Sequence, residues 1–170
     1  MQNLTNKTVI LNLYSTLHKE IQALLSEENS FITILANSSS LIYYSLKDIN
    51  WVGFYLLYGS NLKLGPFQGK VACQTIPLSK GVCGAAVTTK SVQLVNNVHE
   101  FKGHIACDST TNSEIVLPLV INQQVIGVLD IDSAILGRFS YEDQQGLQTI
   151  ASSLCEKLSH TNIIDFLQKF

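Results

Sequence analysis

Near the start of the chain, hydrophobic residues recur every three or four positions, which predicts an amphipathic helix. The residues expected to form its buried stripe are Ile10, Leu13, Leu17, Ile21 and Leu24. A polar interruption follows, and Ser30 is placed to cap a second helix that reaches about Tyr44. The residues of this second helix expected to face inward are Ile34, Leu35, Leu41 and Ile42.

From Ile49 onward the pattern changes to short runs rich in aromatic and β-branched residues, which is typical of strands. The strands predicted from these runs cover residues 49–58, 62–67, 71–76, 92–95, 115–121 and 124–132. The last two are expected to form a hairpin around Asn122 and Gln123. The flexible turn 81–84 leads into a short helical piece at 85–90, and a polar loop covers 96–113.

The chain ends in a third amphipathic helix, predicted over about 140–159 with Ser140 as its cap. Helices at both ends with short strands between them indicate one α+β domain over residues 1–170. We expect the N-terminal helices (about 7–45) and this last helix to cover one face of an antiparallel sheet (about 49–133). The active site is then expected on the other face. Tight turns outnumber crossover helices, which disfavours a doubly wound parallel sheet.

Composition narrows the functional classes. The chain has 170 residues, of which 46% are hydrophobic and 14% charged, so it can bury a sizeable core. A net charge of -2 with scattered Lys and Arg argues against a nucleic-acid partner. The apolar run Ile115–Ile121 is too short for a membrane span, and the first residues lack the apolar core of a signal peptide. A cytoplasmic protein is expected.

The four cysteines are Cys73, Cys83, Cys107 and Cys155. In a reducing compartment stable structural disulfides are rare, and buried inert thiols are the simplest interpretation of each cysteine. His104 and Cys107 have short metal-ligand spacing, but there is no second Cys-x-x-Cys, which disfavours a zinc site. A structural zinc site is therefore not expected.

The strand over 124–132 carries the first candidate chemistry. Alternation places Ile126, Val128, Asp130 and Asp132 on one face. The two carboxylates are either solvated because the strand is leaving the core, or they form the floor of a pocket. In a pocket, crowded carboxylates raise one another's pKa and can serve as proton donors. Glu114, at the start of the neighbouring strand, would join the same group.

The loop that contains Cys107 is the second candidate. A loop cysteine is more accessible than one on a buried stripe, and its reactivity depends on its thiolate content. His104 is either a source of positive charge beside Cys107 or an ordinary surface histidine. Cys83 lies in a glycine-rich turn that opens a short helix, where backbone N–H groups can hold a carboxylate ligand. The residues alone therefore support a thiol–carboxylate site and nothing narrower.

Five segments together resemble a known enzyme family, the free methionine-(R)-sulfoxide reductases, which are built on a GAF domain. The resemblance covers nearly the whole chain and is weakest over the N-terminal helices. The segments that carry it, in order, are Asn50–Tyr55, Gly81–Gly84, Gly103–Ser109, Ser113–Val116 and Leu129–Ser133.

The resemblance implies a role for three of the cysteines. Cys107 matches the nucleophile and Cys73 the resolving cysteine. Cys83 matches a third family cysteine that can also exchange into a disulfide. Cys155 has no counterpart, and we interpret it as structural.

The resemblance also implies the walls of the substrate site. Trp51 and Tyr55 match the aromatic wall around the methyl–sulfur end of the substrate. Glu114, Asp130 and Asp132 match the carboxylates around the sulfoxide and the amino-acid head, with Glu114 or Asp132 as the expected proton donor.

The implied reaction is the reduction of free L-methionine-(R)-sulfoxide. The Cys107 thiolate attacks sulfur and becomes a sulfenic acid, and Cys73 condenses with it to a disulfide that thioredoxin reduces. A homodimer is also implied. The alternative is a non-catalytic GAF module that binds a small ligand, since one fold serves several functions. That alternative gives no reason for cysteines at these positions.

Overall fold

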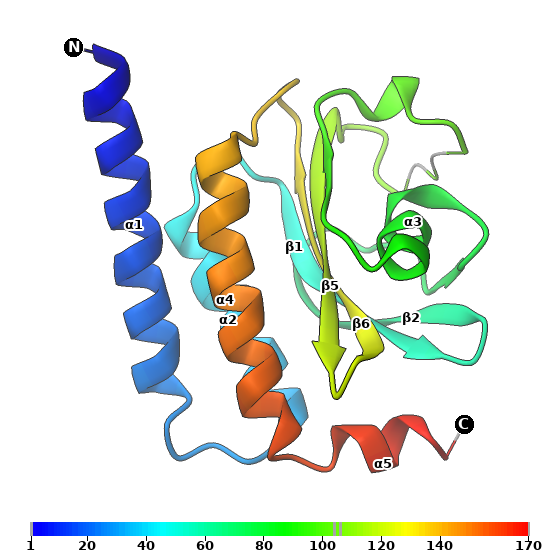
Figure 1. Cartoon of the computed structure of the whole chain (residues 1–170). Coiled ribbons are helices and arrows are strands. Elements are labelled where there is room, and N and C mark those ends of the chain that lie inside the picture. The colour runs from blue at the N-terminus through cyan, green and yellow to red at the C-terminus, as the bar shows by residue number, and fades with distance from the viewer. Residues whose placement is uncertain (1, 104, 106, 170) are drawn as a thin grey trace.

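The structure is a computed structural model that describes residues 2–103, 105 and 107–169 (Figure 1). Its helices are α1 (Gln2–Leu24), α2 (Phe31–Ser45), α3 (Gly81–Thr89), the short 3₁₀ helix η1 (Val98–Glu100), α4 (Tyr141–Ser159) and α5 (Ile163–Leu167). Its strands are β1 (Trp51–Tyr58), β2 (Asn61–Gly69), β3 (Thr75–Pro77), β4 (Gln93–Val95), β5 (Ser113–Ile121) and β6 (Gln124–Ser133).

The six strands form one sheet in the order β3-β2-β1-β6-β5-β4, and every neighbouring pair is antiparallel. The predicted β5–β6 hairpin turns at Asn122 and Gln123. Both residues have positive φ (49° and 65°), as a tight two-residue hairpin turn requires. The antiparallel sheet and the α+β class are confirmed.

The two faces of the sheet are covered differently. Helices α2 and α4 cover one face, with α1 packed against them on the outside, and α3 lies on the other face with the long loops (Figure 1). Alternation along each strand divides the core accordingly. Phe54 and Leu129 belong to the cluster beneath the helices, whereas Trp51, Tyr55 and Val128 belong to the cluster around α3. The α3 face is therefore the one available for a site.

Side-chain caps begin α2 and α4 as expected. The Ser30 side chain accepts a hydrogen bond from the Thr33 backbone N–H (3.4 Å). Ser140 and Asp143 form a reciprocal capping box at the start of α4. The buried Asp143 also accepts a hydrogen bond from the Tyr14 hydroxyl (2.7 Å), which joins α1 to α4.

The predicted stripe of α1 is wrong at two positions. Leu17 and Ile21 are buried, but Leu13 and Leu24 are 37% and 51% exposed. Tyr14 takes the inward position instead, because Gly146 of α4 lacks a Cβ and the Tyr14 ring occupies that space. On α2 the expected inward residues are buried except Leu41, which is half-buried.

The other differences between the predicted and the observed elements concern a strand, two helices and one residue of β6. Residues 70–74 form a loop, so the strand expected at 71–76 is reduced to β3. Helix α3 begins at Gly81 rather than at residue 85, and α5 was not predicted. In β6, Ile126 lies in the cluster beneath the helices rather than on the Asp130 face. The β5–β6 register shifts beside it, and this irregularity reverses the alternation there.

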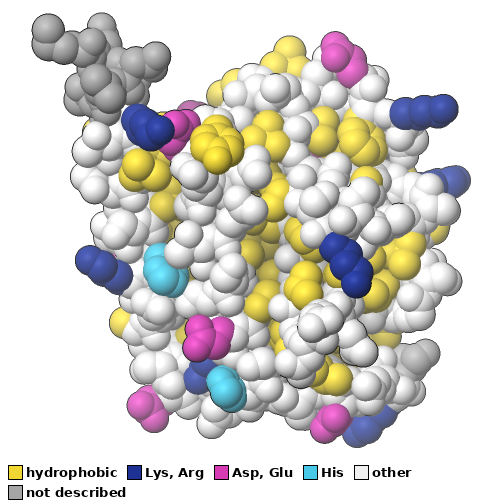
Figure 2. Space-filling view, in the orientation of Figure 1, with side chains coloured by type: hydrophobic (Ala, Val, Ile, Leu, Met, Phe, Trp, Pro, Cys, Tyr) yellow, Lys and Arg dark blue, Asp and Glu magenta, His cyan; other side chains and the backbone are white. Residues whose placement is uncertain are grey.

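The surface over α4 and β5 is mostly uncharged. In Figure 2, hydrophobic side chains gather in the middle of this face, while Lys, Arg, Asp and Glu side chains are scattered singly around it. Cys155 of α4 lines the groove between α4 and β5 and packs against the core beneath the helices. Cys155 therefore belongs to the helix-covered side of the sheet and not to the cluster around α3.

Candidate active site

Three carboxylates meet where β5 and β6 run side by side. In the register of the hairpin, Glu114 lies opposite Asp132, and Val116 lies opposite Asp130. One carboxylate oxygen from each of the three acids lies within 4.8 Å of the others. Glu114 and Asp130 are only 5% and 6% exposed. The interpretation of these acids as a solvated strand end is therefore wrong.

Burial controls the protonation of this group. Desolvation, followed by repulsion from Glu114, raises the pKa of Asp130 well above its ordinary value. Desolvation and the neighbouring acids likewise raise the pKa of Asp132. Both side chains are thus favoured in the neutral form, which can donate a proton. Asp130 Oδ1 is buried and accepts no hydrogen bond from the described residues.

An aromatic wall stands beside the carboxylates on β1. The rings of Trp51 and Tyr55 are stacked with their centroids 5.9 Å apart, and Phe67 stacks on Trp51 at 5.5 Å. Trp51 also lies directly opposite Asp132 in the β1–β6 register. Gly53 leaves room for the indole, because a Cβ there would lie 2.5 Å from the Trp51 Cη2 atom. The predicted wall is therefore present and borders the acids.

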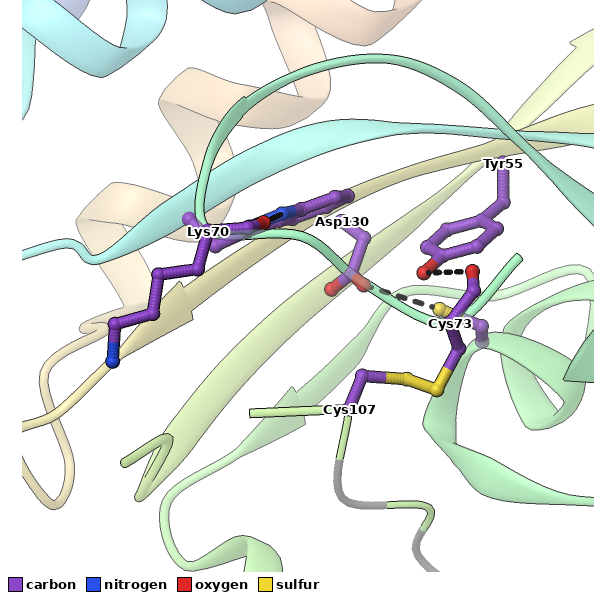
Figure 3. The surroundings of a disulfide bond; sticks show 7 residues. Tyr55, Lys70, Cys73, Cys107 and Asp130 are labelled. Carbon is purple, nitrogen blue, oxygen red and sulfur yellow. Dashed lines mark hydrogen bonds between the residues drawn. A yellow bond between two sulfur atoms is a disulfide. The ribbon is translucent and has the colours of Figure 1, made fainter. Parts of the chain in front are cut away.

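The cysteines enter from two loops. Cys73, between β2 and β3, and Cys107, before β5, are joined by a disulfide with their Cα atoms 5.3 Å apart (Figure 3). Both residues are half-buried. From the sequence alone, Cys73 could have been a buried, inert thiol. The disulfide excludes that interpretation. His104, the suggested source of charge beside Cys107, lies outside the described residues.

Cys83 is a free, buried thiol in the first turn of α3. Its Sγ donates a hydrogen bond to Asp130 Oδ2 (3.4 Å). Desolvation, followed by the charge of Asp130, raises the pKa of this thiol well above its ordinary value. In this oxidised state Cys83 is therefore a hydrogen-bond donor to the acidic group, and its exchange into a disulfide stays a prediction.

These groups surround one pocket that opens to the protein surface. Every residue predicted for the site lines this pocket except Cys73, whose sulfur is bonded to the lining residue Cys107. The lining residues are Trp51, Tyr55, Val71, Ala72, Ile76, Gly81, Val82, Cys83, Ile105, Cys107, Asp108, Thr111, Glu114, Asp130 and Asp132.

Polar contacts at the rim of the pocket were not predicted from the sequence. Lys70 Nζ lies 3.3 Å from Asp108 Oδ2, and Asn50 Nδ2 donates to the same oxygen (3.4 Å). Asn50 and Asp108 lie in two of the five segments that carry the family resemblance. The residues that they contact are far away in sequence, so these contacts could not be predicted. Because Val71 was predicted to lie in a strand, its position at the pocket was not expected.

Comparison with known proteins identifies the family. The GAF domain family model matches residues 39–154. Free methionine-R-sulfoxide reductase of Escherichia coli is 53% identical over 161 residues, which cover 95% of this chain and 96% of that protein. This chain belongs to the free methionine-R-sulfoxide reductase family. The resemblance inferred from the five segments is confirmed.

Solved structures of the free methionine-R-sulfoxide reductases agree with the fold. The Staphylococcus aureus enzyme in complex with substrate is 48% identical, with a TM-score of 0.82 over 85% of this chain and 95% of that one. The Neisseria meningitidis enzyme in complex with its substrate is 36% identical, with a TM-score of 0.85 over 88% of this chain and 90% of that one.

Over the described residues, the helices are all too short or too polar to cross a membrane.

The buried acids should make stability depend on pH. Between the ordinary aspartate pKa and the raised pKa of folded Asp130, the folded state binds more protons than the unfolded state. Stability therefore falls as pH rises through this window. Asp130→Asn removes one contribution to that fall, so at pH 8 we expect the variant to be more stable than the wild type by about 1 kcal/mol or more.

Urea unfolding of the oxidised protein at pH 5 and pH 8 measures this difference. The gain should be smaller at pH 5. The exposed Asp165→Asn on α5 is the matched control and should give no pH-dependent gain. A wild-type protein whose stability rises between pH 5 and pH 8 relative to Asp130→Asn would contradict the proposed direction.

Proposed function

We propose that this protein reduces free L-methionine-(R)-sulfoxide to methionine with Cys107 as the nucleophile. The observation that carries the proposal is the Cys73–Cys107 disulfide beside a pocket that is lined by the buried Asp130 and by Asp132, whose pKa values are raised. A redox-active cysteine pair and a proton donor are the two groups that this reaction needs. Membership of the free methionine-R-sulfoxide reductase family supports the same reaction. A ligand sensor would need neither group.

The first step takes place at the Cys107 sulfur. The thiolate attacks the sulfoxide sulfur, and the oxygen is protonated by a neutral carboxyl group. Asp132 fits this donor role because its pKa is raised and it lines the pocket beside Trp51. The S–O bond of the substrate breaks and its oxygen passes to the Cys107 sulfur, which is oxidised to a sulfenic acid while the sulfoxide is reduced and leaves as methionine.

The second step regenerates the enzyme. The Cys73 thiol condenses with the Cys107 sulfenic acid, releases water and leaves the disulfide. A thioredoxin-type dithiol then reduces the disulfide, so that electrons come from thiols and no cofactor is used. A homodimer in the cytoplasm remains part of this proposal.

The same pocket accounts for recognition of a free amino acid. Of the three clustered acids, one can ionise and pair with the substrate ammonium while another keeps its proton. The substrate carboxylate is placed at the start of α3, where Val82 and Cys83 line the pocket. The methyl group lies against the wall of Trp51 and Tyr55.

Cysteine variants separate the two steps. Cys107→Ser should abolish methionine formation, because a hydroxyl cannot replace the thiolate as the nucleophile. Cys73→Ser should still release about one methionine per enzyme and then recycle slowly, since it can form the sulfenic acid but not the disulfide. Methionine is counted by chromatography in burst and steady-state assays with excess dithiol. Cys155→Ser, on the opposite face, is the control and should turn over normally. Substantial turnover by Cys107→Ser would refute its assignment as the nucleophile.

Amide variants test the proton donor. Asp132→Asn and Glu114→Gln keep the size of each side chain and remove its acid, so we expect kcat to fall by roughly ten-fold to a thousand-fold. Initial rates over a range of pH would show whether the fall of the rate at alkaline pH, where the donor loses its proton, disappears with the residue. Near-normal rates in both amides would exclude these two acids as proton donors.

Substrate choice tests the recognition of both ends of the amino acid. Blocking either end would leave a buried charge without its partner, which discriminates strongly. We expect reduction of free L-methionine-(R)-sulfoxide and little reduction of the S epimer or of N-acetylated and peptide-bound sulfoxide. Each compound is supplied separately with excess dithiol, and the methionine-type product is quantified. Equal rates for free and acetylated R substrates would contradict the recognition of a free amino acid.

A further inference from the structure

The loop that carries Cys73 has little packing of its own. Residues 70–74 join β2 to β3 without regular secondary structure, and Val71 is 88% exposed. Cys107 approaches from a second irregular loop, between η1 and β5. Because neither loop is held by a ladder of backbone hydrogen bonds, a few specific contacts must set the distance between the two sulfur atoms.

Two of these contacts come from the aromatic wall (Figure 3). The Trp51 Nε1–H donates a hydrogen bond to the Lys70 carbonyl oxygen (3.1 Å), and the Tyr55 hydroxyl donates to the Cys73 carbonyl oxygen (3.0 Å). Both rings are almost fully buried on β1 and are stacked on each other. Rigid donors on the central sheet therefore hold both ends of the segment 70–73.

A third contact joins the two loops directly. Lys70 Nζ lies 3.3 Å from the carboxylate of Asp108, the residue that follows Cys107. Hydrogen bonds from Thr110 lower the pKa of Asp108, so this carboxylate is ionised. The Lys70 side chain is 65% exposed, which makes the ion pair weak and sensitive to salt.

We propose that Trp51, Tyr55 and the Lys70–Asp108 ion pair are positioning groups for disulfide closure. The inference rests on the proposed function, since it concerns the step that follows formation of the Cys107 sulfenic acid. In that step the Cys73 sulfur attacks the Cys107 sulfur, the S–O bond breaks and the S–S bond forms. The hydroxyl leaves with the Cys73 proton as water, while the Cys73 sulfur is oxidised and the Cys107 sulfur is reduced.

Trp51 and Tyr55 then act in both steps of the cycle. Their ring faces border the pocket, while the indole N–H and the phenol O–H hold the loop that delivers the second thiol. Holding two reacting groups together raises their effective concentration, so loss of one contact should slow closure more than it slows methionine formation. A general structural role would slow both steps to a similar extent.

The test is a single turnover of the reduced protein with free methionine-(R)-sulfoxide and no added reductant. Methionine formation is followed by chromatography. Disulfide closure is followed by mass spectrometry after trapping the remaining sulfenic acid with dimedone. For Tyr55→Phe we expect the ratio of closure rate to methionine-formation rate to fall by about 2- to 10-fold, as expected for one lost hydrogen bond. Lys70→Gln should lower the ratio by about 2- to 3-fold, and 1 M salt should reduce the wild type to the same value.

Two variants on the same strands are matched controls. Tyr58→Phe removes a hydroxyl from β1 on the side of the core beneath the helices. Lys63→Gln removes an ammonium from β2 that contacts Thr75 outside the 70–74 loop. Both should keep the wild-type ratio. An unchanged ratio in folded Tyr55→Phe, or equal slowing of both steps, would overturn the proposal.

Hydrogen peroxide allows disulfide closure to be measured independently of methionine sulfoxide reduction. It converts the Cys107 thiol to the sulfenic acid with release of water, so closure can be measured without methionine sulfoxide. Slower closure in Tyr55→Phe after peroxide would support the positioning role even if the wild type formed no methionine. Unchanged closure after peroxide would overturn that role even if the wild type reduced the sulfoxide normally.

Discussion

The backbone pairing of β1, β6 and β5 is the constraint on which the site depends. It places Trp51, Asp132 and Glu114 opposite one another in a single row across the sheet. Residues directly opposite in antiparallel strands share a face, so the aromatic wall and two acids point into the same pocket. A slip of one residue in β6 would turn Asp130 and Asp132 toward the apolar cluster beneath the helices. The geometry of the pocket is therefore a consequence of strand register.

Burial of the acids lowers the stability of the folded protein and provides proton donors for the reaction. Burying clustered carboxylates disfavours their charged forms, and the free-energy cost appears as raised pKa values at Asp130 and Asp132. The helix-covered face packs a large apolar cluster, and the buried carboxylate on that side, Asp143, is paired with Tyr14 and Arg138. One face of the sheet thus stabilises the domain by apolar packing, and the other holds Asp130 and Asp132, whose raised pKa values favour the proton-donating form.

The residues of the site come from two kinds of element, the regular strands and the irregular loops. The acids and the aromatic rings project from the strands, whereas Cys73 and Cys107 lie on loops that the disulfide joins. The indole N–H and the phenol O–H connect these two parts, because they reach from β1 to the carbonyl groups of the Cys73 loop. The rings that border the pocket therefore also contact the segment that carries Cys73.

The sequence by itself determined the elements with strong local patterns. These are the capped helices, the hairpin at Asn122 and Gln123, and the shared face of Asp130 and Asp132, because periodicity and turn chemistry are local properties. Ordered motifs also identified the family and the cysteine set. Local patterns could not decide between solvated and buried acids, since burial depends on β1, α3 and the loops that cover the pocket.

Only the tertiary structure decided contacts between residues far apart in the chain. It placed Tyr14 in the core through the gap left by Gly146, moved Ile126 to the other face at a register shift, and replaced a predicted strand by the 70–74 loop. It also brought Lys70 to Asp108. Each of these outcomes depends on the space and partners that distant segments provide, and no local pattern in the sequence contains that information.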